Sequence, residues 1–284
     1  MSYPQPYTNF GEAKLHKLVF EAPGVLRVSF NRGKVNAWIE PMWRELDAIF
    51  RFIARDPDVN AIVLTGENRC FTAGLDLMSS SLGAVMDPAG DDPARRAMVM
   101  TYWIQEFQDA LTQMERCHKP VVAAVHNVAY GLAVDLLSAV DIRYAAEDVR
   151  FSIREVDAGL AADIGTLQRF PKIVGNDSWV RELAFTGREF DAKEALQFGF
   201  ISKIVPGGKD AVFAEAIKTA TILAEKSPVA LRNTKHLLLH SRDHTVQEGL
   251  TYTAVLNGAG LQAGDIPEAM MSVMQKKKPN FAKL

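Results

Sequence analysis

The chain has 284 residues, of which 48% are hydrophobic and 23% are charged, and its formal net charge is −2. This length and composition are typical of a soluble globular protein that buries a large core. A net charge so close to zero gives no reason to expect nucleic acid or an anionic membrane as a partner, and no apolar run reaches the ~18–20 residues of a membrane span.

Strand and helix signals alternate in the first part of the chain. Residues 14–20 and 24–30 predict a hairpin that turns at Pro23-Gly24. Apolar residues at helical spacing predict a helix over 40–54. Residues 60–65 are an almost wholly apolar run, as expected for a strand of a parallel sheet that is covered on both faces.

The alternation continues after a loop at 66–77 and a polar excursion at 79–95 that contains Gly and Pro. The elements predicted next are a helix over 96–116, a strand over 121–126, a helix over 132–140, and strands over 142–147 and 149–153. Strands that alternate with helices and return in the same direction indicate crossover units in one large core.

The last part of the chain has a mostly helical pattern. Helices are predicted over 165–173, 177–186, 192–198, 210–226, 228–240, 245–262 and 266–275, with one strand over 200–205. We therefore divide the chain into an α/β core over 1–208 and a helical region over 209–284. We expect this helical region to pack against the core or against another subunit.

Three carboxylates stand among apolar and small residues within 131–166. They are Asp135, Glu155 and Asp163, separated by 20 and then 8 positions. Buried acids must be paired or shifted in pKa. Where they converge, repulsion and burial can keep one protonated and another ionised, which supplies an acid and a base. Taken singly, Asp135 could be a favourable contact with a helix dipole, and Asp163 could be an N-cap.

Two glycine turns follow buried strands. Gly74, within 70–77, could aim the backbone N–H of Leu75 into a pocket, and Gly131 precedes a helix whose first N–H groups are unsatisfied. Backbone donors fixed before reaction stabilise an oxyanion or an enolate. The alternative is that both are ordinary turns. His126 beside the second turn is expected to be a packed residue.

Other kinds of site find little support in the sequence. Only Cys70 and Cys117 are present, and the six histidines show no metal-ligand pattern, so we expect neither a disulfide nor a metal site. No Ser or Cys nucleophile has an evident base partner, and neither GxSxG nor a P-loop occurs.

Several segments together resemble the crotonase (enoyl-CoA hydratase/isomerase) superfamily. They are NRGKVNA near 31–37, CFTAGLDL at 70–77, KPVVAAVH at 119–126, the glycine turn before Asp135, and AFTGREFDAKEALQFGFISKIVP at 184–206. The resemblance covers nearly the whole chain. It implies an α/β crotonase (ClpP-like) fold, in which repeated ββα units form a parallel-rich core sheet followed by a helical C-terminal region. It also implies a homotrimer or homohexamer built through that region.

Two segments are similar, within that superfamily, to the isomerases that convert 3,5-dienoyl-CoA to 2,4-dienoyl-CoA. They are EVDAGLAADIGTLQR at 155–169 and SRDHTVQEGL at 241–250. Simple hydratases typically carry a GxxPGxGG segment where this chain has Ala162, Asp163 and Ile164. The resemblance therefore implies an isomerase of the β-oxidation of unsaturated fatty acids.

The resemblance also implies roles for particular residues. Asp163 would take a proton from C2 and Glu155 would deliver one to C6, with Asp135 as a third acid of the pocket. The oxyanion hole would be the N–H groups of Leu75 and Leu132. The acyl-CoA path would be lined by Ala73, Gly74, Leu75, Asp76, Leu77 and Ala133. No cofactor or metal is implied, because CoA enters as part of the substrate.

The chain departs from the family pattern at Gly131-Leu132-Ala133, where many members carry three glycines. We expect the added side chains to narrow the approach or to demand a different backbone angle. Two alternative functions remain open. One is a 2-enoyl-CoA hydratase that uses Asp135 and Glu155 to add water, and the other is a catalytically silent acyl-CoA-binding homologue.

The final tripeptide is Ala282-Lys283-Leu284. A small, a basic and a leucine residue in this order are close to the SKL address that the peroxisomal import receptor reads. The N-terminus has neither the apolar core of a signal peptide nor the Arg-rich pattern of a transit peptide. We therefore predict a peroxisomal location.

Overall fold

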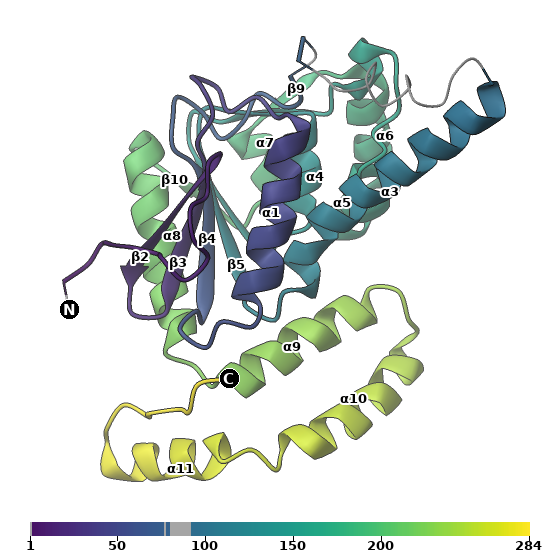
Figure 1. Cartoon of the computed structure of the whole chain (residues 1–284). Coiled ribbons are helices and arrows are strands. Elements are labelled where there is room, and N and C mark those ends of the chain that lie inside the picture. Colours follow the sequence, from purple (N-terminus) through teal and green to yellow (C-terminus); the bar gives the residue numbers. More distant parts are fainter. Residues whose placement is uncertain (1, 77, 80–91) are drawn as a thin grey trace.

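A computed structural model describes residues 2–76, 78–79 and 92–284. Leu77 and most of the predicted excursion at 79–95 lie outside these described residues. The described chain contains a seven-stranded sheet in the order β1-β2-β3-β4-β5-β7-β10 and a three-stranded sheet in the order β6-β8-β9. Figure 1 shows helices on both sides of the larger sheet and a separate group of helices below it. The predicted α/β class with a parallel-rich core sheet is confirmed.

The larger sheet begins with an antiparallel hairpin and continues with parallel strands. Its strands are β1 (Gln5–Pro6), β2 (His16–Ala22), β3 (Val25–Phe30), β4 (Ala61–Gly66), β5 (Val121–Val125), β7 (Ile142–Ala146) and β10 (Lys203–Val205). From β3 onward each neighbouring pair is parallel. The carboxyl ends of these strands therefore meet at one edge, where open α/β sheets bind their ligands.

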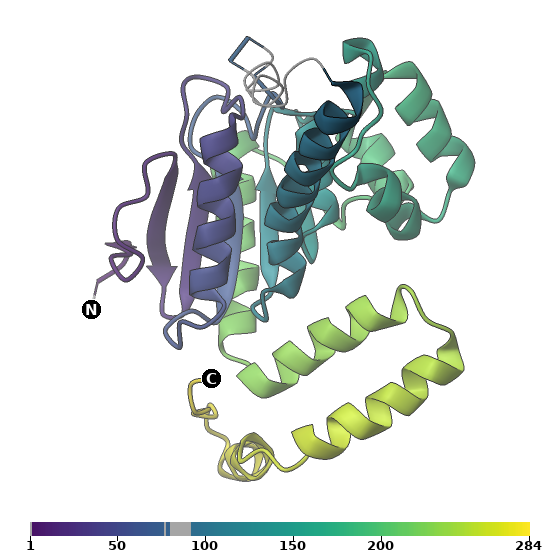
Figure 2. The same ribbon diagram turned by 45° about the vertical axis from the view of Figure 1, so that its right-hand side comes forward.

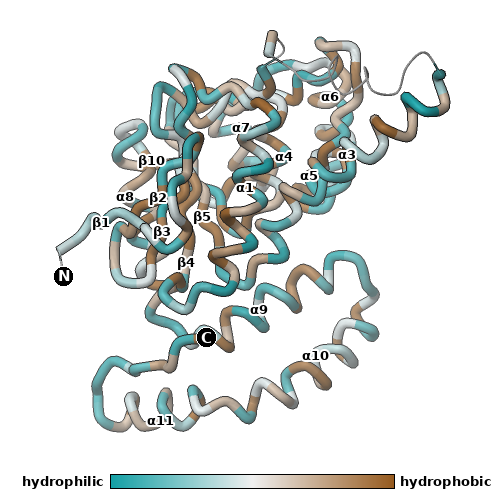
Figure 3. Tube along the Cα trace, in the orientation of Figure 1, coloured by the Kyte–Doolittle hydropathy of each residue, from teal (hydrophilic) through white to brown (hydrophobic). Residues whose placement is uncertain are grey.

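The strands of this sheet are apolar because both faces are buried. Ile62 and Leu64 of β4 pack into the core formed with α1 (Glu40–Ile53) and α3 (Pro93–Arg116). Ala61 and Val63 face the opposite way, into a second core with α8 (Gly208–Ala224). Figure 3 shows the resulting hydrophobic strands between more polar coverings.

A smaller sheet follows the carboxyl end of β5, and further helices complete the core. The strands are β6 (Val128–Tyr130), β8 (Arg150–Ser152) and β9 (Glu189–Asp191), and the helices are α4 (Leu132–Ser138), the 3-10 helix η2 (Glu155–Ala158), α5 (Thr166–Val174), α6 (Asp177–Thr186) and α7 (Ala192–Gln197). β6 pairs with β8 in parallel, and β8 pairs with β9 antiparallel. This small sheet fixes the turns before α4 and η2, where the predicted site lies.

Three helices at the end of the chain form an arm beyond the core, and Lys235 of the first helix donates to the backbone carbonyls of Met114 and Lys119 in the core. These helices are α9 (Pro228–Ser241), α10 (Val246–Gly260) and α11 (Asp265–Gln275), and both Figure 1 and Figure 2 show them as an arm below the sheet. The predicted division at residue 208 stays a prediction. In the structure α8, which begins at that point, packs on β4, β5 and β7. No helix among the described residues is both long and apolar enough to cross a bilayer.

The predicted elements agree closely with the structure, with a few short exceptions. The hairpin, the helices and the four central strands lie within a few residues of their predicted bounds. The strands β1, β6 and β9 and the helix η2 were not predicted. Each has only two to four residues, too few for a periodic pattern, and their pairing depends on neighbours that are distant in sequence.

Candidate active site

Two glycine turns, which the sequence singled out separately, lie against each other. Thr72 connects the two segments that lead into these turns. Its N–H donates to the carbonyl of Val128 at 3.1 Å, and its carbonyl accepts from the N–H of Tyr130 at 3.2 Å. Gly74 has φ of 92°, and a Cβ there would lie 2.9 Å from the carbonyl oxygen of Tyr130. Only glycine tolerates both this conformation and this contact.

The two predicted backbone donors are unused within the part of the chain that the structure describes. Neither the N–H of Leu75 nor that of Leu132 donates to a carbonyl there. Leu132 is the first residue of α4, and Gly131 before it adopts φ of 54° and ψ of −117°. A free N–H at the start of a helix carries a partial positive charge, which favours a developing oxyanion nearby.

The side chains of Leu132 and Ala133 point into the core. Leu132 is 2% exposed and Ala133 is 0% exposed, and both belong to the main hydrophobic cluster. This burial gives no support to the expectation that the two side chains narrow the approach, which stays a prediction. The triple-glycine pattern can be relaxed at these two positions because helical residues there project inward. Glycine is retained at 131, where the backbone requires it.

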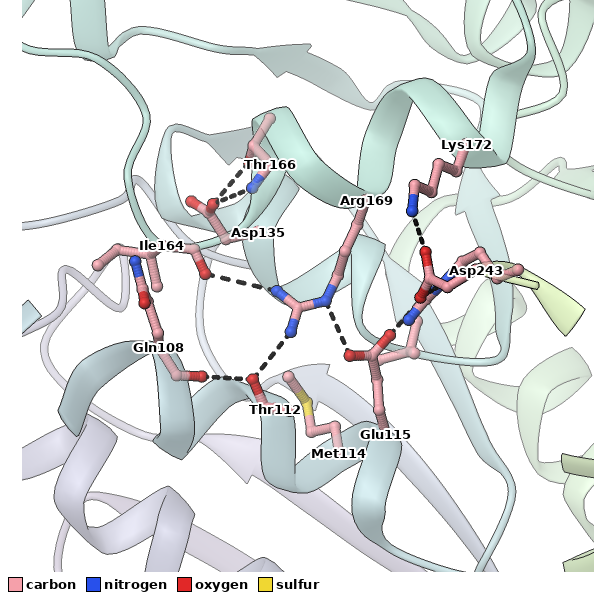
Figure 4. Close-up of polar contacts among 12 residues, drawn as sticks. Gln108, Thr112, Met114, Glu115, Asp135, Ile164, Thr166, Arg169, Lys172 and Asp243 are labelled. Atoms are coloured by element: carbon pink, nitrogen blue, oxygen red, sulfur yellow. Dashed lines mark hydrogen bonds and ion pairs between the residues drawn. The ribbon is translucent and has the colours of Figure 1, made fainter. Parts of the chain in front are cut away.

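Asp135 is buried and binds the next helix along the site. It is 1% exposed, and its Oδ1 accepts from the backbone N–H of Thr166 at 2.6 Å and from the Thr166 hydroxyl at 2.7 Å, as Figure 4 shows. Gly165, the N-cap of α5, provides no side-chain cap. Asp135 therefore satisfies the first turn of α5, and it also lies in the first turn of its own helix α4, where the predicted contact with the helix dipole stays an alternative.

Burial raises the pKa of Asp135 to about 7, and the negative charge of Glu155 adds to this effect. The hydrogen bonds from Thr166 act in the opposite direction, since they stabilise the ionised form. The charge of Asp163 is a smaller contribution that also raises the pKa. The charges of both other acids therefore raise the pKa of Asp135.

Glu155 is the first residue of η2, and its carboxyl group faces the glycine turn. Its Oε1 would lie 3.4 Å from a Cβ on Gly131. Its Oε2 is buried and has no hydrogen-bond partner among the described residues. Burial raises the pKa of Glu155, and the charge of Asp163 raises it further. A buried carboxyl oxygen without a partner is unusual unless it serves a ligand or a proton transfer.

Asp163 lies in the irregular segment 161–165 between η2 and α5. The N-cap of α5 is Gly165, so the alternative that Asp163 is an N-cap is wrong. Burial raises the pKa of Asp163 as well. Its carbonyl oxygen accepts from Gln108 Nε2 at 2.6 Å. The three predicted acids therefore converge, since the charge of Asp163 reaches both Glu155 and Asp135.

In the loop predicted to line the acyl-CoA path, some side chains are exposed and another is held by an ion pair. Ala73 is exposed and Leu75 is 37% exposed, whereas Ala133 has no exposed surface and its predicted substrate contact gains no support. Asp76 Oδ2 accepts from Arg32 Nη2 at 2.8 Å, so this carboxylate fixes the loop. Leu77 lies outside the described residues.

Several residues that build the site were not singled out from the sequence. Asn36, with φ of 49°, donates from Nδ2 to the carbonyls of Cys70 and Phe71. The signal available was the segment NRGKVNA, which was noted only for its resemblance. Thr166 was missed because nothing local links it to Asp135.

Other candidate centres are structural. His126 is 2% exposed, and its Nε2 lies 3.2 Å from the carbonyl of Asn68, so the prediction that it is packed is confirmed. Cys70 and Cys117 are both buried and free. Among the described residues, no group of three or more His, Cys, Asp or Glu side chains could hold a metal ion.

The arrangement supplies an acid, a base and two backbone donors in one place. Carboxyl groups with raised pKa values donate or accept protons near neutral pH, and the free N–H groups stabilise an oxyanion. Such a site is suited to moving protons on a carbon chain next to a carbonyl group.

Comparison with known proteins agrees with this chemistry. The family model described as enoyl-CoA hydratase/isomerase matches residues 21–283. The mitochondrial Delta(3,5)-Delta(2,4)-dienoyl-CoA isomerase of Rattus norvegicus is 45% identical over 254 residues, which are 89% of this chain and 77% of the relative. The peroxisomal Delta(3,5)-Delta(2,4)-dienoyl-CoA isomerase of Arabidopsis thaliana is 40% identical, over 92% of this chain and 93% of the relative.

More distant proteins share the fold. The mitochondrial enoyl-CoA hydratase of Pongo abelii is 31% identical over 89% of this chain and 82% of its own length. The crystal structure of an enoyl-CoA hydratase from Bacillus anthracis superposes with a TM-score of 0.83 at 24% identity, and the match covers 95% of this chain and 99% of that chain. The predicted crotonase fold is confirmed.

Proposed function

This chain belongs to the enoyl-CoA hydratase/isomerase family, and from that premise we propose that it isomerises 3,5-dienoyl-CoA to 2,4-dienoyl-CoA in the β-oxidation of unsaturated fatty acids. The observation that carries the proposal is the placement of Asp163 near the other two acids. Asp163 does not cap α5, its pKa is raised by burial, and its charge reaches Glu155 and Asp135. A proton transfer between two distant carbons needs such a pair of acids.

The backbone donors would act first. The thioester oxygen would accept from the N–H groups of Leu75 and Leu132. As C2 loses its proton, negative charge develops on this oxygen and along the diene. Donors that are already in place stabilise that charge without reorganisation, and removal of one such donor typically costs ~10²–10³-fold in kcat.

The two acids would then move the protons. Asp163, ionised, takes the C2 proton, and its raised pKa makes it a stronger base than an ordinary carboxylate. The electron pair shifts so that C2=C3 and C4=C5 double bonds form and C6 becomes the basic carbon. Glu155, whose pKa is raised by burial and further by the charge of an ionised Asp163, is the acid that carries the proton in this proposal and delivers it to C6. Proton exchange with each other or with water restores the starting state.

Asp135 takes a supporting part in this proposal. Its Oδ1 is occupied by Thr166, so it holds the start of α5 directly after Asp163. The hydrogen bonds from Thr166 to Asp135 also disfavour the hydratase alternative, in which Asp135 would activate water. Substrate and product are isomers, so the reaction requires no cofactor that carries electrons or groups, and CoA is part of the substrate.

The proposed partners follow from the same reaction. The substrate is an acyl-CoA thioester, with no nucleic acid or membrane involved. The family resemblance and the exposed apolar side chains of α10 and α11 support a homotrimer or homohexamer. The peroxisomal relative and the tripeptide Ala282-Lys283-Leu284 support import into peroxisomes through the import receptor, although the animal relatives are named as mitochondrial.

The direct test follows ultraviolet absorbance after a 3,5-dienoyl-CoA is added, because conjugation of the product diene with the thioester changes the spectrum. We expect turnover of this substrate and little or no hydration of crotonyl-CoA. Hydration without diene isomerisation would instead favour the hydratase, and acyl-CoA binding without turnover of either substrate would favour the silent homologue.

Asp163→Asn tests the assigned base. Asparagine keeps the shape of the side chain but cannot accept the C2 proton, so kcat should fall by about 10²-fold or more, with KM changed less than about threefold. Asp157→Asn is the matched control, since Asp157 is an exposed acid of the same segment. Near-normal kcat in Asp163→Asn would remove Asp163 from the mechanism.

A further inference from the structure

One face of α3 presents a polar row to the segment that carries Asp163. The row consists of Gln108, Thr112 and Glu115, at spacings of four and three residues, so their side chains lie on the same side of the helix. Figure 4 shows this polar row pointing toward Ile164 and Arg169. The reaction proposed above uses none of these residues.

Gln108 holds the backbone of the proposed base itself. Its Nε2 donates to the carbonyl oxygen of Asp163 at 2.6 Å. The backbone carbonyl of Gln108 accepts from the hydroxyl of Thr112 at 2.6 Å. Asp163 lies in the irregular segment 161–165, so its carbonyl is held by a side chain from another element rather than by a helix or a strand.

Arg169 fixes the other end of the same segment. Its Nε donates to Glu115 Oε2 and its Nη2 to the hydroxyl of Thr112, both at 2.9 Å. Its Nη1 lies 3.5 Å from the carbonyl oxygen of Ile164. A Cβ on Gly165 would lie 1.9 Å from that Nη1, and Gly165 has φ of 138°. The guanidinium group therefore covers a turn that only glycine fits.

The charges that hold Arg169 are largely buried. The side chains of Arg169 and Glu115 are 13% and 9% exposed, and Glu115 Oε1 also lies 2.7 Å from Arg242 Nη1 at the end of α9. Interactions of this kind are stronger and more rigid than exposed ion pairs. The polar row thus holds the segment 163–165 at two carbonyls, directly through Gln108 at Asp163 and indirectly through Arg169 at Ile164.

From these contacts we propose that Gln108 and Arg169 are positioning residues for Asp163. They hold the backbone directly after the Asp163 side chain, at the carbonyls of Asp163 and Ile164, so that the Asp163 carboxyl group stays at the distance and angle that proton transfer from C2 requires. A catalytic group displaced by ~1 Å can lose about 10²-fold in rate, and a catalytic group in an irregular loop needs such support. The assignment rests on the proposed isomerase function.

Gln108 gives the cleaner test. Removal of Arg169 would leave the buried charge of Glu115 partly uncompensated and would destabilise the fold. Gln108→Leu removes the donor at similar size, and Gln105→Leu makes the same change at an exposed position on the same helix. Gln108→Glu, which keeps the shape and loses the amide donor, serves if the leucine variant does not fold.

We expect Gln108→Leu to lower kcat for 3,5-dienoyl-CoA by about tenfold or more, with KM within about threefold of wild type, and Gln105→Leu to change neither. Because Gln108 acts through Asp163, Gln108→Leu should add less than about twofold to the loss in an Asp163→Asn background. Wild-type kcat in the Gln108 variants would overturn the proposal. So would a fall in kcat from Gln108→Leu that is as large in the Asp163→Asn background as in the wild type.

Amide hydrogen exchange over residues 161–166 provides a readout that does not depend on the reaction. Exchange there should be faster in Gln108→Leu than in wild type and unchanged in Gln105→Leu. Failure of the wild type to isomerise dienoyl-CoA would reject the proposed function alone. Unchanged exchange in Gln108→Leu would reject the positioning role whatever the enzyme does.

Discussion

At the scale of single residues, the three acids differ in what surrounds them. Asp135 is satisfied by Thr166, Glu155 has a buried oxygen without a partner among the described residues, and Asp163 is held through its backbone. The sequence shows three similar carboxylates, and only their neighbours distinguish a supporting acid from a pair that could exchange protons with a substrate.

The pKa of Asp135 makes the stability of the protein depend on pH. The folded-state pKa is about 7 against an ordinary value of 3.8, so between these pH values the folded state keeps a proton that the unfolded state has lost. Stability contributed by this group therefore falls as pH rises from about 4 to about 7, by on the order of 4 kcal/mol in total.

Asp135→Asn should remove this dependence. The Oδ1 of asparagine can still accept from Thr166, but the side chain no longer titrates. The unfolding free energy of the variant minus that of the wild type should rise by on the order of 2 kcal/mol from pH 5 to pH 8. Urea denaturation at the two pH values measures this. An equal difference between variant and wild type at both pH values would contradict the assigned burial of an ionisable Asp135.

At the scale of elements, the two glycine turns position the site. β6 and β8 fix the approach to α4, and Gly131 turns the chain so that the N–H of Leu132 is left free. The same turn lies against the carboxyl group of Glu155. One backbone conformation therefore leaves the proposed oxyanion donor free and places it beside the proposed acid.

Gly131→Ala tests this dependence. An alanine at φ of 54° and ψ of −117° is strained by about 1–3 kcal/mol, and its Cβ would meet Glu155 Oε1 at 3.4 Å. We expect a loss of stability of that size together with a fall in kcat of about tenfold or more.

Gly199→Ala is the matched control. Gly199 has φ of 77° and no atom within 4 Å of its added Cβ. It should lose stability for the same backbone reason and keep its kcat. Equal effects on kcat from the two substitutions, measured with unfolding curves for both, would show that the turn has no special role.

At the scale of the whole molecule, α10 and α11 leave large apolar side chains in solvent. Val246, Val255, Val273 and Met274 are each more than 70% exposed, at 81%, 74%, 79% and 83%. Large apolar side chains exposed in such number on two helices favour an interface between proteins, and the arm lies outside the core that carries the site.

Charge on this surface should therefore prevent assembly. The double variant Val255→Glu and Met274→Glu should sediment as a monomer, because a buried unpaired carboxylate is strongly unfavourable at an apolar interface, and circular dichroism should show unchanged helix content. Gln247→Glu adds charge at a polar position of α10 and should leave assembly intact. A wild type that is itself monomeric in sedimentation would contradict the predicted trimer or hexamer.

The sequence by itself was sufficient for the elements and for the identity of the acids. Apolar strands buried on both faces, helices with one apolar stripe and turns at glycine are local patterns, so β2 to β5 and α1 could be placed without coordinates. Asp135, Glu155 and Asp163 stood out because acids are rare among such small and apolar residues.

Only the tertiary structure decided what these residues contact. The contact of Asp135 with Thr166 spans 31 residues, and that of Gln108 with Asp163 spans 55. Such contacts depend on how crossover connections bring segments together, and local sequence does not encode that distance. The burial of Leu132 and Ala133 likewise follows from how α4 packs on the core, which their size alone does not show.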